Sequence, residues 1–542
     1  MKKYILGLAV SALALTTVSC NDFLNTQPEG SPTTGTYFTN DQQAIDAVEM
    51  LYADVQQEGC FGREFFWEQA AANDVVWGRT RSYPALATFN YSGDESPLRS
   101  VWERLTRTTA RANWVVEQLS KKASLTAIEK RSLGEAYFMR ALTHFYIAYR
   151  YGTDLQGVPF CRYEDFENGY DNSIPEQQPS VMENYRLIIE DLDKALANLP
   201  KFEEYGIDDR GRAHKAACVG YKAKTYAYWA TWDQTKWNDV ISCVNELETT
   251  YGRDLADTYA QVFSSDFADF WNKEYIWTIP CNGGANGGGL EFPGVILENK
   301  GWGVYNGWGQ NKPSYDIYEE MLKDGAGNDR IVRSILEYGQ EFYFNGEKRQ
   351  FYSTSDIESG FMINKYMDPF KHKDMTNEYV NPNGDWPTAR INFPLLRFAD
   401  CLLLRAEAYL MTGKPGEAAK DINRVRTRSN LTPIGATATM ADLYHERRCE
   451  LAFEFSDHLF DLKRWNRSSN AEIKALADAE LNASPRVRHY SNRGDVNSDF
   501  TIGQYEDYKV KNKYDAHFMV FPYPSAEITK AGGKLKQNKD YK

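Results

Sequence analysis

The sequence predicts a mainly α-helical protein, in which pairs of helices stack like tetratricopeptide units and support a loop-rich part with short β elements. Apolar residues recur at three- and four-residue spacing over two stretches, about 41–250 and 396–465. Short turns with glycine or proline separate successive helical runs. Between about 251 and 395 this periodicity fades, and glycine, asparagine and aromatic residues dominate. We expect residues 41–542 to form a single body, whose last segment, 466–542, is again rich in loops.

The helical runs come in consecutive pairs. The clearest pair runs from Leu396 to Arg428 and is broken by the sequence Thr-Gly-Lys-Pro at 412–415. One such hairpin is too small to bury its own apolar face, so neighbouring hairpins must stack. The other predicted helices begin at Asp41 and cover about 99–120, 126–150, 179–198, 212–230, 236–250 and 440–465.

The N-terminus has the pattern of an export signal. Two lysines precede the apolar run Ile5–Val18, which is shorter than a membrane-spanning helix. A serine followed by Cys20 resembles a bacterial lipoprotein cleavage site, so residues 1–19 are predicted to be a signal peptide and Cys20 the acylated N-terminus. The alternative is an ordinary secretory signal in which Cys20 is incidental. Stable anchoring needs more than one acyl chain. Residues 20–40 are predicted to form an extended tether between this anchor and the body.

Charge and cysteine content exclude several classes. The formal net charge is −13 and the pI about 5.3, so the average field repels nucleic acid. Apart from Cys20, seven cysteines remain, without a CxxC pair, which argues against a zinc site or a complete disulfide framework. Cys218, Cys401 and Cys449 lie in apolar helical patterns and are predicted to be small buried hydrophobic residues.

Several motifs, in order along the chain, carry a resemblance to a known family. They are Cys20-Asn-Asp-Phe-Leu24, Gly134-Glu-Ala-Tyr-Phe-Met-Arg-Ala141, Gly211-Arg-Ala-His-Lys-Ala-Ala217, Arg397-Phe-Ala-Asp400, Glu446-Arg-Arg-Cys-Glu-Leu-Ala-Phe-Glu454, Phe460-Asp-Leu-Lys-Arg-Trp465 and Phe521-Pro522. Their order and spacing resemble those of the SusD/RagB family of outer-membrane nutrient-binding lipoproteins. The resemblance covers nearly the whole chain.

The resemblance implies a SusD-like fold and a function in nutrient uptake. It implies a lipid-anchored protein on the exterior of the outer membrane that captures oligosaccharide or polysaccharide and delivers it to a SusC-like TonB-dependent transporter. Because some members bind other nutrients, a peptide- or protein-binding member is the first alternative. A surface scaffold that binds only protein is the second.

Catalytic signatures are few. His445-Glu446 lacks the second histidine of a zinc-protease motif, and the glycine clusters do not form a nucleotide-binding pattern. A surface glycosidase would need two carboxylates beside the scissile bond, and none of the 75 acidic residues stands out as such a pair. We therefore expect a binding protein without catalytic activity and without a required cofactor.

Two segments mix aromatic side chains with glycine and short polar residues. An indole or phenol ring can cover the apolar face of a sugar, while amide and guanidinium groups bond its hydroxyl rim. The first segment follows Asn73-Asp74 and extends to Phe89-Asn90-Tyr91, and the second lies in the central loop-rich part. The predicted ligand-binding residues are Trp77, Arg79, Arg81, Tyr83, Asn282, Trp302, Tyr305 and Trp308.

Other tryptophans and arginines are predicted to be structural. A single tryptophan is more often core than ligand platform, and Trp277 alternates within a strand-like run. Arg79 and Arg81 have two interpretations: contacts to an anionic sugar, or solvated charges of a loop. The second is the favoured one. Core tryptophans are expected at Trp102, Trp114, Trp229 and Trp465, and arginines paired within the scaffold at Arg140, Arg397 and Arg464.

One further pattern resembles a calcium loop. Asp495, Asn497, Asp499 and Glu506 have the spacing of its oxygen ligands, but Phe500 stands where the loop needs glycine. An Asp- and Asn-rich turn is the favoured interpretation, with calcium as the alternative.

Overall fold

The computed structural model of the protein describes residues 37–76, 84–165, 175–281, 297, 308–344, 347–351, 359–367, 391–455, 457–506 and 511–541. The predicted signal peptide and Cys20 lie outside these residues. Tyr37 and Phe38, predicted as the end of the tether, pack against Trp114, with ring centroids 5.2 and 4.9 Å away. The body therefore begins before the first helix.

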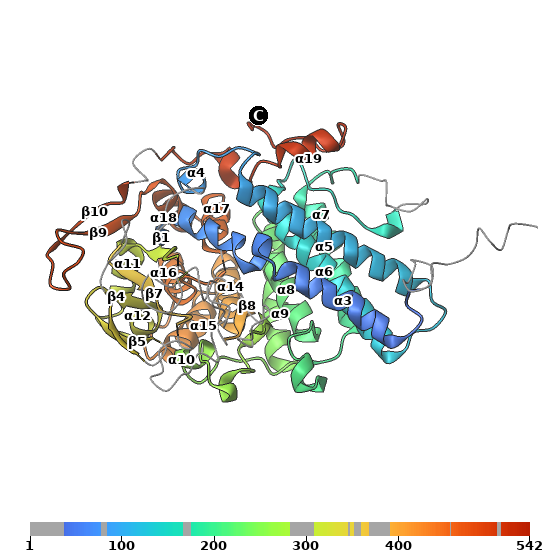
Figure 1. Cartoon of the computed structure of the whole chain (residues 1–542), viewed down its shortest axis with the longest axis horizontal. Helices are drawn as coiled ribbons and strands as arrows, with labels where there is room; N and C mark the ends of the chain where they lie inside the picture. Colours follow the sequence, from blue (N-terminus) through green and yellow to red (C-terminus); the bar gives the residue numbers. More distant parts are fainter. Residues whose placement is uncertain are drawn as a thin grey trace, which may run out of the picture.

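Helices form most of the described structure (Figure 1). They are α3 (Asp41–Val55), α4 (Pro84–Ala87), α5 (Ser96–Ser120), α6 (Ala127–Tyr151), α7 (Val181–Asn198), α8 (Lys215–Trp229), α9 (Trp237–Thr249), α10 (Tyr259–Val262), α11 (Tyr315–Leu322), α12 (Asp329–Ser334), α14 (Phe398–Met411), α15 (Pro415–Arg428), α16 (Met440–Glu450), α17 (Asp457–Asn466), α18 (Ala471–Asn482) and α19 (Ser525–Lys530). The short helices η1 (Glu58–Gly62) and η2 (Glu64–Ala72) follow α3.

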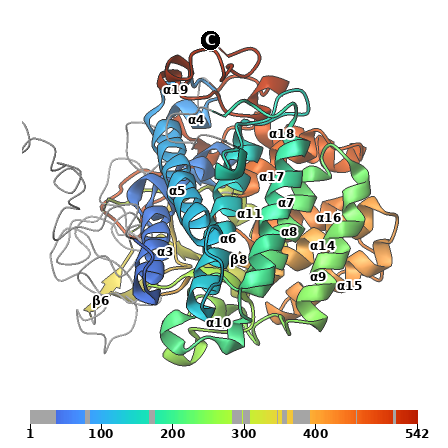
Figure 2. The same cartoon turned by 90° about the vertical axis from the view of Figure 1, so that its right-hand side faces the viewer.

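The predicted stacking of helix pairs is confirmed. From α5 to α9, each helix packs against the next one in the chain, and α14 continues the stack by packing against both α8 and α9 (Figure 2). Local signals set the ends of these helices: Thr126 and Glu129 form a reciprocal cap at the start of α6. Gly220 allows α8 to approach the strands, since a Cβ there would lie 2.4 Å from Ile276.

The strands form small antiparallel ladders beside the helical stack. They are β1 (Val75–Val76), β2 (Tyr275–Ile279), β3 (Lys312–Pro313), β4 (Ile335–Glu337), β5 (Glu341–Phe344), β6 (Glu347–Gln350), β7 (Phe361–Ile363), β8 (Phe393–Arg397), β9 (Arg486–Tyr490) and β10 (Phe500–Gln504). The described pairs are β1–β3, β2–β8, β4–β7, β5–β6 and β9–β10. Because β8 runs directly into α14, the β2–β8 ladder joins the loop-rich part to the helical stack.

The structure differs from the prediction in the C-terminal third. The helix predicted over 440–465 is two helices, α16 and α17, because side chains from a distant segment bind the carbonyl groups where α16 ends. Lys365 Nζ donates to the carbonyl oxygens of Glu450 and Ala452, at 3.2 and 2.6 Å. Phe453 follows with a positive φ of 65°.

A second difference concerns the segments predicted as loop-rich, which contain helices α11, α12 and α18.

Buried charges hold the helical stack together, as predicted for three arginines. Arg140 makes two hydrogen bonds of 2.7 Å to Asp191. Arg464 bonds Glu407 at 2.6 Å. Arg397 bonds Glu274 and Glu450, each at 2.7 Å, and Glu454 at 2.6 Å.

The predicted core residues are largely confirmed. Trp277, Trp102 and Trp465 are buried, as are Cys218, Cys401 and Cys449. Trp114 and Trp229 are half-buried and pack against the main core. Every helix among the described residues is too short or too polar to cross a bilayer.

Candidate functional site

The described strands that border the two predicted aromatic segments pair in one small ladder. Strand β1 pairs with β3 so that Val75 lies opposite Pro313 and Val76 opposite Lys312. The first segment begins directly after β1, and the second ends shortly before β3. Because the pairing is antiparallel, the chain leaves β1 and enters β3 at the same end of the ladder. Val76 and Lys312, which border the two segments, thus lie side by side although more than 200 residues separate them in the sequence.

Most of the predicted ligand-binding side chains lie outside the described residues: Trp77, Arg79, Arg81, Tyr83, Asn282, Trp302 and Tyr305. Trp308 is described. It is half-buried against the main core, and the guanidinium of Arg63 lies 5.6 Å from its ring centroid. A cation over one face of the ring and partial exposure of the side chain are compatible with a ligand platform.

The end of the first predicted segment is core. Phe89 and Tyr91 are buried, and both rings contact Phe518, at centroid distances of 5.2 and 5.5 Å. The prediction that they supply surface aromatic groups is wrong, because the C-terminal segment covers them.

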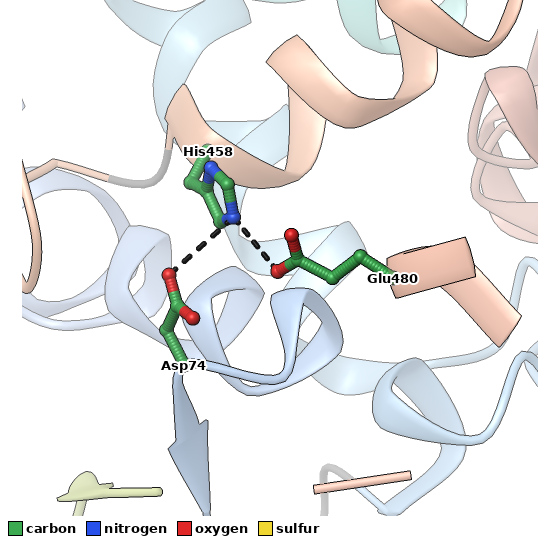
Figure 3. Close-up of side chains that lie close together, drawn as sticks. All are labelled: Asp74, His458 and Glu480. Carbon is green, nitrogen blue, oxygen red and sulfur yellow. Dashed lines mark hydrogen bonds and ion pairs between the residues drawn. The ribbon is translucent and has the colours of Figure 1, made fainter. Parts of the chain in front are cut away.

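A buried polar cluster fastens the ladder to the helical stack (Figure 3). Asp74, which directly precedes β1, accepts hydrogen bonds from Nε and Nη2 of Arg448 on α16, at 2.9 and 2.7 Å. His458 Nε2 on α17 lies 2.8 Å from Glu480 Oε1 on α18 and 3.4 Å from Asp74 Oδ2. The base of the first segment is therefore tied to three helices.

Burial and neighbouring charges act differently on the two carboxyls. Burial raises the pKa of Asp74 to about 6, although Arg448 and His458 act to lower it. Burial also opposes ionisation of Glu480, but there Arg448 and His458 outweigh it and lower the pKa. The pKa of His458 is raised, because Glu480 and Asp74 outweigh the effect of burial.

The geometry of this cluster does not suit a metal ion. Among the described residues, Asp74, His458 and Glu480 are the group whose ligand atoms lie close enough together to hold one. However, Arg448 already binds Asp74 at 2.7 Å and lies 3.5 Å from Glu480. A divalent cation would have to displace a buried guanidinium, so we interpret the cluster as an anchor for β1.

The four predicted calcium ligands do not form one loop. Asp495, Asn497 and Asp499 lie in the exposed turn between β9 and β10, where the Asp495 side chain accepts the Asn497 amide at 2.9 Å. Glu506 lies beyond the other end of β10, separated from the turn by the five residues of that strand. The described geometry is that of an Asx turn in a hairpin. Calcium binding itself stays a prediction.

Sequence reasoning missed the anchor. Arg448 lies within the family-like motif Glu446–Glu454, but His458 and Glu480 carry no spacing that points to Asp74, nearly 400 residues earlier. Only their adjacency in the fold identifies the group.

Two family models match the chain, one in its N-terminal half and one in its C-terminal half. The model described as the SusD family matches residues 273–541. The model described as starch-binding associating with outer membrane matches residues 22–227.

Relatives match over most of their length. A SusD-like protein of Bacteroides ovatus is 25% identical and covers 86% of this chain and 83% of the relative. The starch-binding protein SusD of Bacteroides thetaiotaomicron is 23% identical, over 86% and 89%. A SusD-like protein structure from Bacteroides fragilis has a TM-score of 0.73 at 20% identity, over 93% and 98%. A laminarin-binding SusD-like protein has a TM-score of 0.68 at 22% identity, over 93% and 100%.

Proposed function

Because the chain belongs to the SusD family, we propose that it is a surface glycan-binding protein that captures oligosaccharide or polysaccharide for a SusC-like TonB-dependent transporter. The family is associated with the outer membrane and with starch binding. The ligand of this chain, its lipid anchor and its transporter partner are parts of the proposal.

The β1–β3 ladder is the observation that carries the glycan proposal. It joins the bases of two segments that contain tryptophan, tyrosine, asparagine and arginine, the side chains suited to stacking on a sugar and bonding its hydroxyls. The anchor around Asp74 fixes the position of this base. Less conformational entropy is then lost when a ligand binds. A composition of 14% aromatic residues supports the same interpretation.

Two relatives support a glycan over a peptide. One is named a starch-binding protein, and the other a laminarin-binding protein. The two polymers differ in linkage, so they support the ligand class and leave the particular sugar to experiment.

The proposed membrane association rests on the N-terminal pattern. The apolar run before Cys20 resembles a lipoprotein signal, and acylation at this cysteine would tether the body to the outer membrane. Metabolic labelling with a radioactive fatty acid tests it: the wild-type chain should be labelled and Cys20→Ala should not. Equal labelling of both would refute the anchor.

Calorimetric titration against starch, laminarin and xyloglucan oligosaccharides tests the proposed ligand. Trp302→Ala and Trp308→Ala should each weaken binding at least tenfold, because one ring–sugar stack is lost. Trp232→Ala is a matched control: its ring is also half-buried with an arginine, Arg467, over it at 4.4 Å, and it lies in the turn after α8. Tight peptide binding without any glycan binding would refute the proposal. So would reducing ends released over time, which indicate a glycosidase.

A further inference from the structure

An apolar cavity of about 320 Å³ lies between α5, α6 and the C-terminal segment, apart from the β1–β3 ladder. Its walls include Trp102 on α5 and Ile147 on α6, and its roof includes Ala531 and Leu535. An engineered cavity of roughly 150 Å³ is large enough to bind benzene, and ligand pockets begin at about 300 Å³. The space is therefore large enough for a small ligand.

The roof is held at both ends. At the first residue of α19, the Ser525 amide donates to the Gly93 carbonyl at 3.2 Å. After α19, Asn538 Nδ2 donates to the carbonyl oxygens of Tyr151 and Phe521, at 2.9 and 2.8 Å. These bonds fix the segment between them above the cavity, so the cavity is preformed and its roof does not collapse onto α5.

The polar side chains in the wall are already bonded to the protein. His144 Nδ1 lies 2.8 Å from the Arg140 carbonyl, and its Nε2 accepts the Cys161 amide at 3.1 Å. Thr106 Oγ1 donates to the Trp102 carbonyl at 2.8 Å, and Thr109 Oγ1 lies 2.8 Å from the hydroxyl of Thr143. A buried water needs two to four polar partners, so this interior favours an apolar occupant.

The segment that forms the roof is basic. Between Ser525 and Lys542 there are five lysines and two acidic residues, in a chain of net charge −13. Lys530 borders the cavity with its side chain mostly exposed, and it is paired at 2.6 Å with Glu527, which also borders the cavity. Lys534 and Lys536 flank Leu535 and are exposed.

Lys530, Lys534 and Lys536 form a basic rim beside the apolar interior. From these two features, we propose that this cavity binds the aliphatic chain of an anionic amphiphile, with its carboxylate or phosphate head group at the lysines of the rim. The aliphatic chain leaves water for the contacts with Trp102, Ile147 and Leu535, so a longer aliphatic chain buries more apolar surface and binds more tightly. The head group stays at the surface, where Lys530 and its neighbours attract a negative charge.

Titration of the full chain with decanoate, decanol and decyltrimethylammonium tests the site. We expect decanoate to bind best, decanol more weakly and the cation worst. Ala531→Trp should fill the cavity and lower decanoate affinity at least tenfold, whereas Ala526→Trp, at an exposed position of the preceding helix α19, should leave it unchanged. Absence of decanoate and decanol binding, or unchanged affinity in Ala531→Trp, would overturn the proposal.

A second variant keeps the test decisive if Ala531→Trp does not fold. Lys530→Glu should weaken decanoate binding severalfold and leave decanol binding unchanged; equal effects on both would overturn the role of the rim. Phosphatidylglycerol vesicles distinguish the source of the ligand. Vesicle binding that decanoate competes away assigns the site to a membrane lipid, and decanoate binding without vesicle binding assigns it to a free carboxylate.

Discussion

The two halves of the helical stack differ in the contacts that dominate their interiors. Around α6 and α8, aromatic rings pack against one another beside the buried pair of Arg140 and Asp191: the ring of Phe145 contacts those of Tyr146, Tyr149, Tyr221 and Tyr228, with centroids 5.0–6.2 Å apart. Around α14 to α17 the interior is ionic, and its arginines bond buried carboxylates.

The difference lies in how each half tolerates change. Aromatic packing is spread over many weak contacts, so one lost ring costs a fraction of the total. A buried ion pair has already lost the hydration of both charges, so removal of one partner leaves the other uncompensated. The ionic half also supports the anchor at Asp74, which places the base of the proposed glycan site on the more sensitive half.

The largest expected effect is that of Arg397→Met. It removes the one cation that contacts Glu274, Glu450 and Glu454 together, and leaves Arg428 on the first two and Lys365 on the third. We expect a loss of about 3–5 kcal/mol in the free energy of unfolding. Urea unfolding measures it. Arg186→Met, which breaks an exposed pair with Glu183, should cost less than about 1 kcal/mol. Similar losses in both variants would show that burial does not set the cost of breaking an ion pair, which would remove the reason for calling the ionic half sensitive.

Lys463→Met should stabilise the protein. Lys463 is fully buried, its Nζ has no hydrogen-bond partner among the described residues, and it lies 4.2 Å from the ring centroid of Phe521. Burial lowers its pKa from 10.5 to about 7, so between those values the unfolded chain binds more protons and stability rises with pH. The variant should gain about 2 kcal/mol at pH 7 and lose this slope, as measured by urea unfolding across pH. A loss of stability would indicate that the charged amine contributes favourably.

Acid should weaken the ionic half selectively. Burial favours the neutral forms of Glu320 and Asp324, but hydrogen bonds from His445, at 2.7 and 3.0 Å, outweigh it and lower each pKa to about 2. Their stabilisation is present above the unfolded pKa values of 4.5 and 3.8 and is lost as pH falls toward 2. The side chains of Glu320 and Asp324 keep only 10% and 5% exposure to solvent, and other cations also contact both, so we expect about 1 kcal/mol from each His445 contact. His445→Gln should flatten this dependence in unfolding measured from pH 5 to 2; an unchanged slope would contradict the assignment.

Phe145→Leu should have the smallest effect. The leucine keeps most of the apolar volume and loses the edge contacts to the surrounding tyrosines, for a cost of about 1 kcal/mol. Thermal unfolding at pH 7 measures it, with no change in its pH dependence from pH 5 to 2. A loss near that of Arg397→Met would mean that the aromatic half is as intolerant as the ionic half.

Much of the scaffold could be predicted from the sequence, because its signals are local. Apolar spacing and turn residues placed the helices near their observed bounds, and the pairing of Arg140, Arg397 and Arg464 followed from charge within apolar motifs. The break between α16 and α17 could not be predicted, because Lys365, from a distant segment, binds the carbonyl groups there. The prediction of surface positions for Phe89 and Tyr91 was wrong for the same reason. A residue in a polar loop becomes part of the core when the distant C-terminal segment covers it.

The sequence by itself determined the helical class, the stacked hairpins and the composition suited to sugar, since each depends on neighbours a few residues apart. Only the tertiary structure decided which segments meet. It paired β1 with β3, brought His458 and Glu480 to Asp74, and placed Ala531 and Leu535 over a cavity between α5 and α6. Contacts of this kind depend on shape and charge complementarity between surfaces that form only when the chain is folded, and no periodicity in the sequence records them.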